Sequence, residues 1–311
     1  MVIVFFGTPQ FAVPTLELLL ASRHCVALVV TQPDKRRGRG QKVTDSPVKA
    51  AALAHDIPVY QPERLRAPEV AETLRRHAPD LGVVVAYGKL IPDQLLQLPR
   101  LGMVNVHASL LPKYRGAAPV HRAVINGEEQ TGVTIMQVVK ALDAGDMLAK
   151  STRPIDLEET SDALERALAD DGARLLLPVL DQLESGTARP EPQNEAASTY
   201  AARLTKEEGL VDWSQSARQI HNRVRGLYPW PHAYTYLEGA RLILLKARPK
   251  PGTTASAPGT IVDVTRDSID VETGNGRLSI LELQPEGKRP MQTREFLSGR
   301  SVRPGMRFDS A

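Results

Sequence analysis

Short apolar runs alternate with longer mixed segments through the first half of the chain. The runs occupy residues 2–6, 27–31, 81–86, 103–107 and 133–138. Between them, Ser46 and Pro47 supply an N-cap and a first helical position for a helix over residues 48–55, and residues 68–77 form a second helix with a basic end. Apolar residues recur at about helical spacing over residues 160–184. Strands that alternate with helices predict a Rossmann-like parallel sheet.

The second half of the chain has a different pattern. Residues 186–202 are polar and contain prolines, which is typical of a linker. A short helix over residues 217–225 is then expected, followed by β runs at 233–237, 241–245, 259–264, 269–273 and 278–283. This pattern predicts a smaller OB-like β-barrel. We therefore expect an α/β domain over residues 1–189, a linker at about 190–205, and a β domain over 206–311.

The composition narrows the class of protein. A length of 311 residues favours two hydrophobic cores, and 24% charged with 42% hydrophobic residues is ordinary for a globular protein. Cys25 is the only cysteine, so neither an intramolecular disulfide nor a thiolate metal cluster can form. The histidines lack metal-ligand spacing, and no apolar run approaches the roughly 18 residues of a membrane span. We expect a cytoplasmic monomer without a membrane segment or metal ion.

Two polar side chains interrupt the apolar run at 103–107. Asn105 and His107 occupy alternate positions, so in a strand they share one face and can converge on one small group. Catalytic groups gather at the carboxyl ends of such strands. Asp143, after the apolar run that ends at Val139, could orient the imidazole and stabilise its protonated form while Asn105 donates to a developing oxyanion. That set suits acyl transfer to an amine; Asp146 is an alternative carboxylate, and a loop-shaping role remains the alternative for Asp143.

The first strand ends in Gly7-Thr8-Pro9, where a dinucleotide-binding domain would have GxGxxG. The lysine and hydroxyl residue of a P-loop are also missing there. These differences argue against hydride transfer and nucleotide hydrolysis.

Residues 105–116, read as Asn-Val-His-Ala-Ser-Leu-Leu-Pro-Lys-Tyr-Arg-Gly and followed by Asp143, resemble the signature of folate-dependent formyltransferases. The resemblance implies that Asn105, His107 and Asp143 are the catalytic set. It also implies that 10-formyltetrahydrofolate is the formyl donor. The folate-binding residues that it implies are Ser109, Leu110, Leu111 and Pro112.

A basic loop follows the second predicted strand, with five cations in eight residues. These cations are Lys35, Arg36, Arg37, Arg39 and Lys42. Such a run is usually a solvated surface, but its arginines can also pair with phosphates and stack on bases. It resembles the basic insertion of family members that act on initiator methionyl-tRNA, with Arg39 matching a functional arginine. Segments 6–9, 46–49 and 227–231 extend this resemblance over essentially the whole chain.

The resemblance implies transfer of the formyl group to the amino group of methionine on initiator tRNA, with tRNA contacts also in the second domain. Two alternatives stay open. One is a formyltransferase for a small-molecule amine such as a ribonucleotide or nucleotide sugar, against which the basic loop and the β domain argue. The other is a noncatalytic RNA-binding protein on a degenerate Rossmann domain, against which the intact Asn105, His107 and Asp143 argue.

Overall fold

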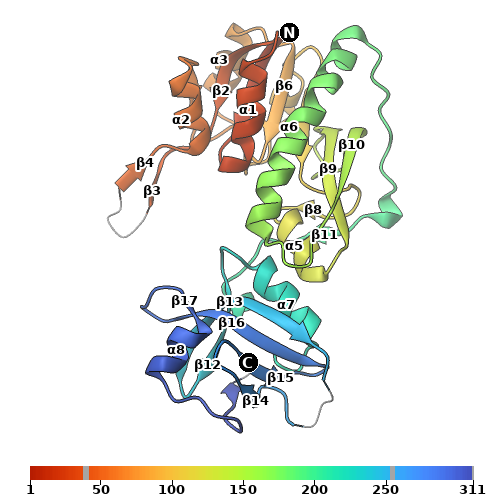
Figure 1. Ribbon diagram of the computed structural model, residues 1–311. Helices are drawn as coiled ribbons and strands as arrows, with labels where there is room; N and C mark the ends of the chain where they lie inside the picture. Colours follow the sequence, from red (N-terminus) through yellow and green to blue (C-terminus); the bar gives the residue numbers. More distant parts are fainter. Residues whose placement is uncertain (38–41, 253–255, 310–311) are drawn as a thin grey trace. The chain divides into compact units, whose positions relative to one another are not determined.

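The computed structural model describes residues 1–37, 42–252 and 256–309. It divides into two compact units (Figure 1). The first unit comprises Met1–Pro119, Gln130–Pro154 and Glu165–Ala201, and the second comprises Val120–Glu129, Ile155–Leu164 and Ala202–Ala311. Each unit is therefore assembled from three separate stretches of the chain.

The first unit is built on a seven-stranded sheet with the order β10-β9-β7-β6-β1-β2-β5. Its strands are β1 (Val2–Gly7), β2 (Cys25–Val30), β5 (Val59–Tyr60), β6 (Leu81–Val85), β7 (Met103–His107), β9 (Gln130–Gln137) and β10 (Met147–Pro154). The strands from β5 to β7 pair in parallel, as predicted. The prediction that the run at 133–138 extends the parallel sheet was wrong: β9 pairs antiparallel with β7, and β10 antiparallel with β9.

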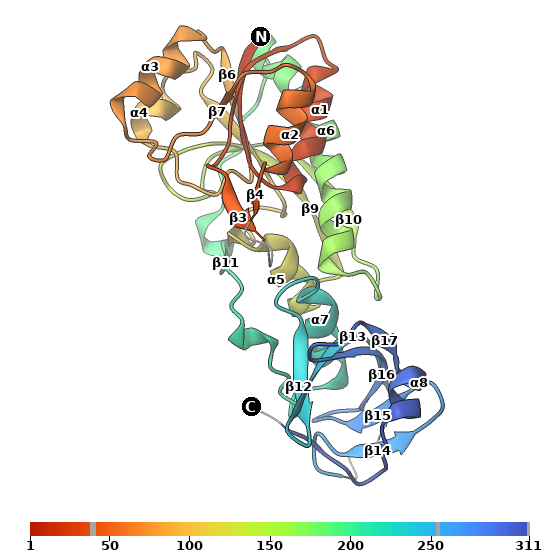
Figure 2. The ribbon, with the colours of Figure 1, turned by 90° about the vertical axis from the view of Figure 1, so that its left-hand side faces the viewer.

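Helices cover both faces of this sheet. They are α1 (Val13–Leu20), α2 (Pro47–Ala54), α3 (Pro68–Arg76), α4 (Asp93–Leu96) and the part of α6 (Ser161–Ser185) from Glu165 onward. Figure 2 shows α3 and α4 on one side of the strands and α1, α2 and α6 on the other. The predicted cap of α2 is confirmed, because the Ser46 side chain accepts a hydrogen bond from the backbone N–H of Lys49.

The apolar core matches this layering. On one face, Phe6 of β1 and Leu74 of α3 belong to one buried cluster with Leu95 of α4. On the other face, Gly172 of α6 lies so close to the sheet that an added Cβ would meet Val106 at 2.6 Å. The sheet is thus covered by apolar contacts on both faces.

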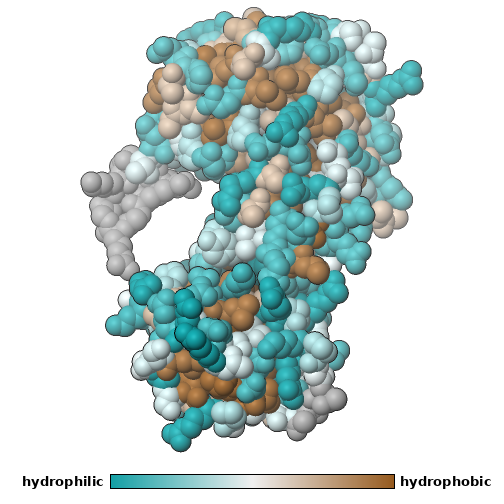
Figure 3. Space-filling view, viewed as in Figure 1, coloured by the Kyte–Doolittle hydropathy of each residue, from teal (hydrophilic) through white to brown (hydrophobic). Residues whose placement is uncertain are grey.

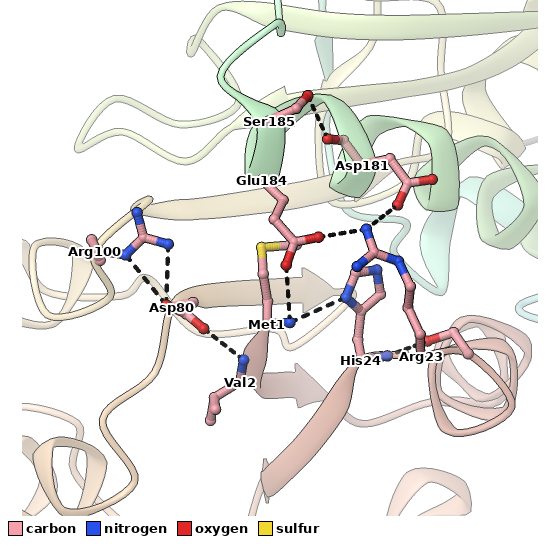
Figure 4. Close-up of polar contacts among 10 residues, drawn as sticks. Met1, Val2, Arg23, His24, Asp80, Arg100, Asp181, Glu184 and Ser185 are labelled. Atoms are coloured by element: carbon pink, nitrogen blue, oxygen red, sulfur yellow. Dashed lines mark hydrogen bonds and ion pairs between the residues drawn. The ribbon is translucent and has the colours of Figure 1, made fainter.

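A polar cluster connects α6 with the starts of β1 and β2 (Figure 4). Arg23 donates to Asp181 at 2.7 Å and also binds Glu184. Asp80 accepts the backbone N–H of Val2 at 2.8 Å, and this bond, with a smaller contribution from Arg100, lowers the pKa of its carboxyl group. The cluster fixes the end of the sheet opposite to the carboxyl ends of the parallel strands.

Two further two-stranded pairs belong to the first unit. β3 (Lys35–Arg37) and β4 (Lys42–Thr44) form an antiparallel hairpin that leaves the sheet after β2 (Figure 1). β8 (Arg115–Gly116) pairs in parallel with β11 (Tyr200–Ala201). The second pair brings the end of the predicted linker against the segment that follows β7.

The second unit is a curled antiparallel sheet with the order β14-β15-β16-β13-β12-β18, with β17 paired to β16. Its strands are β12 (Ala233–Leu237), β13 (Ala240–Lys250), β14 (Ile261–Val264), β15 (Ile269–Glu272), β16 (Arg277–Pro285), β17 (Met291–Gln292) and β18 (Phe308–Asp309). Its helices include α5 (Pro119–Asn126) except for its first residue, α7 (Ala217–Gly226) and α8 (Thr293–Gly299). The predicted class, a Rossmann-like domain followed by a smaller β domain, is confirmed.

The core of the second unit is centred on Trp213. Its indole ring stacks on Phe308 with a centroid distance of 5.4 Å, and its N–H donates to the Thr235 hydroxyl at 3.1 Å. All three residues are fully buried. An aromatic pair with a satisfied polar group thus packs Trp213 against the neighbouring strands β12 and β18.

No helix in the described parts of the chain is both long enough and apolar enough to cross a membrane. On the face shown in Figure 3, hydrophilic side chains are spread over both units, with apolar patches between them.

Acidification should weaken the second unit through three histidines, of which His221 is buried and His121 and His232 are half-buried. Burial lowers the pKa of His121, His221 and His232 below the ordinary 6.5, and neighbouring arginines lower it further. As the pH falls through 6.5, the unfolded chain therefore binds more protons than the folded one, and the free energy of unfolding decreases. Both tryptophans of the chain, Trp213 and Trp230, lie in this unit, so their fluorescence reports its unfolding.

We expect the urea midpoint measured by tryptophan fluorescence to fall between about pH 7 and about pH 5.5, above the range where most carboxylates titrate. The triple variant His121→Gln, His221→Gln, His232→Gln should show a smaller fall. Equal midpoints for the unmodified protein at both pH values would contradict this assignment.

Candidate active site

Asn105 and His107 lie on the same face of β7, near the carboxyl end of the parallel strands. β7 extends over the predicted residues, and Asn105 pairs with Val84 of β6 and Met136 of β9. Asn105 is partly exposed, and among the described residues its side chain has no hydrogen-bond partner. Its amide is therefore available to a ligand, although it stands in the middle of the sheet.

His107 is held between a carbonyl and a carboxylate. Its Nε2 lies 2.9 Å from the backbone oxygen of Tyr114, and its Nδ1 lies 3.8 Å from Oδ2 of Asp143. A carbonyl oxygen only accepts, so Nε2 carries the proton of this bond, and Nδ1 is the nitrogen that faces Asp143. His107 as a whole residue is 6% exposed. Protonation at Nδ1 would turn this contact with Asp143 into an attractive ion pair.

Asp143 lies in the loop between β9 and β10, and its side chain is turned toward the segment after β7. Its Oδ2 accepts the backbone N–H of Gly116 at 2.9 Å. Its backbone has a φ of 50°, in the left-handed region that only a few non-glycine residues adopt. Of the two carboxylates considered from the sequence, Asp143 is the one that contacts His107. The structure thus brings Asn105, His107 and Asp143 together in one unit.

The loop of Asp143 depends on a close backbone approach at Gly145. A Cβ atom at Gly145 would lie 1.8 Å from the carbonyl oxygen of Gln137, the last residue of β9. The Gln137 N–H in turn donates to the Asp146 carbonyl at 2.9 Å. Only glycine fits here, and this contact fixes where the loop turns.

The segment from Ser109 to Pro112 is braced from inside the unit. The Ser109 hydroxyl donates to the Lys113 carbonyl at 2.7 Å, and the Thr134 hydroxyl donates to the Ser109 carbonyl at 2.7 Å while accepting the Leu111 N–H at 3.1 Å. Leu111 packs against Met136 and Met147. Ser109 and Leu111 are buried, whereas Leu110 and Pro112 remain partly exposed.

The predicted basic loop is described only in part. The backbones of Lys35, Arg36, Arg37 and Lys42 belong to the β3–β4 hairpin, and Arg39 lies outside the described residues.

Within the described residues, no group of three or more histidine, cysteine, aspartate or glutamate side chains is arranged to hold a metal ion.

Comparison with known proteins identifies the family. A formyl transferase family model matches residues 1–180, and a model of the formyl transferase C-terminal domain matches residues 203–301. The chain is 50% identical to a methionyl-tRNA formyltransferase from Pelobacter propionicus over 97% of this chain and 94% of that protein. The chain belongs to the methionyl-tRNA formyltransferase family. A second member, from Geobacter metallireducens, is 48% identical over 98% of both chains.

The fold of this methionyl-tRNA formyltransferase family member extends to more distant enzymes. A solved structure of WlaRD, a sugar 3N-formyl transferase in the presence of dTDP and 5-N-formyl-THF, matches with a TM-score of 0.68 over 93% of this chain and 99% of that chain. Its sequence identity is 18%, so the match concerns the architecture. Both units of the chain, and not only the Rossmann-like one, are therefore shared with an enzyme that acts on another acceptor.

Several residues that hold the site together were missed from the sequence. Tyr114 and Gly116 supply the backbone partners of His107 and Asp143, and Thr134 braces the segment after β7. Arg115 and Gln193 join that segment to the loop of Asp143. Tyr114 to Gly116 stood in the family signature, but nothing in the sequence near Gln193 marked it as part of a site.

Proposed function

We propose that Asn105, His107 and Asp143 are the catalytic groups of this methionyl-tRNA formyltransferase. The chain transfers a formyl group to the amino group of methionine on initiator methionyl-tRNA, the step that prepares this tRNA for translation initiation. The near full-length identity to relatives that carry this name supports this acceptor. The observation that carries the catalytic assignment is the contact between His107 Nδ1 and Asp143 Oδ2 beside the available amide of Asn105.

The formyl donor is folate-derived, and we propose 10-formyltetrahydrofolate. This donor brings an electrophilic carbonyl carbon and a nitrogen leaving group to the site. Three large apolar side chains on loops of the first unit remain exposed to receive a flat ring, namely Leu90, Val139 and Leu142, with exposed fractions of 74%, 43% and 46%. An ion pair of 3.6 Å between Lys140 and Asp93 brings the loop after β9 beside the start of α4, which follows Leu90.

The four residues from Ser109 to Pro112 are proposed to form one wall of the folate site. Leu110 and Pro112 can contact a ligand with their side chains, whereas the buried side chains of Ser109 and Leu111 act by fixing the course of the backbone.

In the proposed reaction the methionine amine attacks the formyl carbon, and negative charge develops on the formyl oxygen. The Asn105 amide donates a hydrogen bond to that oxygen, and the positive charge of the protonated His107 ring stabilises it electrostatically, so both favour charge that is absent from the ground state. In this proposal the Asp143 carboxylate holds the cationic ring and receives the proton that the attacking amine loses. The tetrahedral intermediate then collapses: the bond between the formyl carbon and the folate nitrogen breaks, and that nitrogen leaves in its protonated form. No covalent bond to the chain is formed, and the steps call for no metal ion.

Two further parts of the proposal concern where and how the chain works. All three proposed catalytic side chains come from one unit of one chain, which supports a monomeric enzyme. The bacterial relatives act on a tRNA, which supports a cytoplasmic location. We retain residues 1–189 as the catalytic domain and 206–311 as a domain that contacts tRNA.

The first experiment measures formyl transfer from 10-formyltetrahydrofolate to methionine-charged initiator tRNA. Uncharged initiator tRNA, charged elongator tRNA and small amines are assayed in parallel. Selective formylation of the charged initiator supports the proposal. Rapid transfer to a small amine with none to tRNA would overturn the choice of acceptor and leave the catalytic groups in place.

The basic loop over residues 35–42 should bind the phosphate groups of the tRNA. Replacing Lys35, Arg36, Arg37, Arg39 and Lys42 with alanine should raise the apparent dissociation constant for tRNA, because each phosphate contact releases counterions on binding. The slope of log affinity against log salt should become shallower by about 1 per lost contact. Binding is measured by fluorescence titration over a series of salt concentrations.

The matched control removes two exposed cations of the same unit, Arg75 and Arg76 at the end of α3, which should leave the slope unchanged. A hairpin variant with the original salt slope would show that these cations only face solvent.

A further inference from the structure

Residues 186–202, expected to be a linker, are bonded to the first unit at several points. The Glu191 and Met147 backbones exchange two hydrogen bonds of 2.8 Å at the start of β10. Farther along, Thr199 accepts the Tyr114 N–H with its hydroxyl and the Arg115 N–H with its carbonyl, at 2.8 and 2.9 Å. We name this segment the strap. It runs from the end of the Asp143 loop to the segment that follows β7.

Gln193 stands in the middle of the strap and uses its whole side-chain amide. Its Nε2 donates to the carbonyl oxygens of Asp143 and Gly145, both at 2.8 Å. Its Oε1 accepts from Nε and Nη2 of Arg115 at 3.0 and 2.7 Å. The two donors and two lone pairs of the amide are all in use, so only a glutamine side chain supplies this complete pattern.

The Arg115 guanidinium, which binds the Gln193 amide, is itself held by further contacts. Its other edge pairs with both carboxylate oxygens of Glu195 at 2.9 and 2.8 Å, and 12% of its side chain is exposed. The next residue, Gly116, donates its N–H to the Asp143 carboxylate. The consecutive residues Arg115 and Gly116 therefore both hold the Asp143 loop. Gly116 binds the Asp143 carboxylate directly, and Arg115 holds the loop backbone through Gln193.

We propose that Gln193 is a positioning residue for catalysis, which sets the carboxylate of Asp143 against His107. The two bonds to the Asp143 and Gly145 carbonyls hold the turn in which Asp143 has its left-handed φ of 50°. Without them the loop loses the contacts that oppose relaxation of this backbone. The inference rests on the proposed function, because it assigns to Gln193 a role that acts only through Asp143.

The test compares three single variants in the formylation assay. Gln193→Leu removes all four hydrogen bonds, and Gln193→Glu removes the two donors to the loop but keeps an acceptor for Arg115. Both should lower kcat by about tenfold to a hundredfold, because a small displacement of a catalytic group is enough for such a loss. KM for the charged tRNA should stay unchanged. The control, Glu195→Gln, weakens the outer edge of Arg115 without touching the loop and should keep kcat.

A second readout follows the geometry directly. Hydrogen exchange of the Gly116 amide, whose acceptor is the Asp143 carboxylate, should be faster in both Gln193 variants and unchanged in Glu195→Gln. Loss of kcat without faster exchange at Gly116 would overturn the positioning role, as would a retained kcat in Gln193→Glu.

A double-mutant comparison separates this inference from the proposed function. In an Asp143→Ala background the Gln193→Leu change should cause no further loss of kcat, since the group that it positions is gone. A further full loss in that background would overturn the role of Gln193 and leave Asp143 catalytic. A normal kcat for Asp143→Ala alone would instead refute the catalytic assignment on which the inference rests.

Discussion

Replacing Asn105 or His107 with alanine should lower the rate of formyl transfer by on the order of 10² to 10³ and leave the protein folded. The loss is large because both side chains stabilise an oxygen that gains charge only in the transition state, Asn105 as a hydrogen-bond donor and His107 through its positive charge, and one such group is typically responsible for a factor of this size. Single-turnover measurements with saturating donor and charged tRNA isolate the chemical step.

The two variants also differ in a useful way. Asn105 has no hydrogen-bond partner among the described residues, so its removal leaves no other group unpaired. His107 binds the Tyr114 carbonyl and faces Asp143, so its removal also frees those groups. His55→Ala is the matched control, since His55 is half-exposed on the surface beside Glu17. Near-normal turnover of Asn105→Ala would exclude Asn105 as the oxyanion donor.

Gly145→Ala should lower the rate of formyl transfer, although Gly145 has no side chain that takes part in the reaction. The added methyl group would lie 1.8 Å from the Gln137 carbonyl, which is backbone and cannot turn aside, so the loop of Asp143 must shift. Overpacking of this kind costs about 1 to 3 kcal/mol or more. We therefore expect a lower melting temperature by calorimetry together with a fall in kcat, because Asp143 moves with the loop.

Gly299→Ala at the end of α8 is the control, since an added Cβ there meets no atom within 4 Å. It should leave both the melting temperature of the first unit and kcat unchanged. A Gly145→Ala protein with wild-type activity would show that the loop tolerates displacement and that its position does not govern the rate.

The sequence predicted those parts of the fold and site that depend on local pattern. The helix after Ser46 begins where its cap and proline place it, and β7 covers the predicted residues, because capping and alternation act within a few neighbours. β10 was not predicted: its exposed edge carries polar residues such as Lys150 and Thr152, which lack the apolar run of a buried strand. The direction of β9 is likewise decided by its partner β7 rather than by its own residues.

The same distinction explains the site. Asn105 and His107 could be paired from their spacing alone, and Asp143 from its place after an apolar run. Gln193 could not be predicted as part of the site, because its partners Arg115 and Asp143 lie 78 and 50 residues earlier in the chain. No residue pattern within the strap indicates that it packs against them. A polar segment rich in proline has the same local composition whether it is a solvent-exposed linker or packs against a catalytic loop.

The three-part construction of the second unit bears on how the chain is made. Gly226 of α7 packs against Ile125 of α5 and accepts a hydrogen bond from Ser161 at 2.8 Å, so residues far apart in the chain meet at one helix. Residues 120–129 and 155–164 leave the ribosome well before the stretch from 202 onward exists to receive them. During synthesis these two stretches cannot complete their packing until the residues from 202 onward have been made. A fragment that begins at residue 202 would contain the C-terminal domain sequence of the family but lack residues 120–129 and 155–164, which complete the fold of this unit.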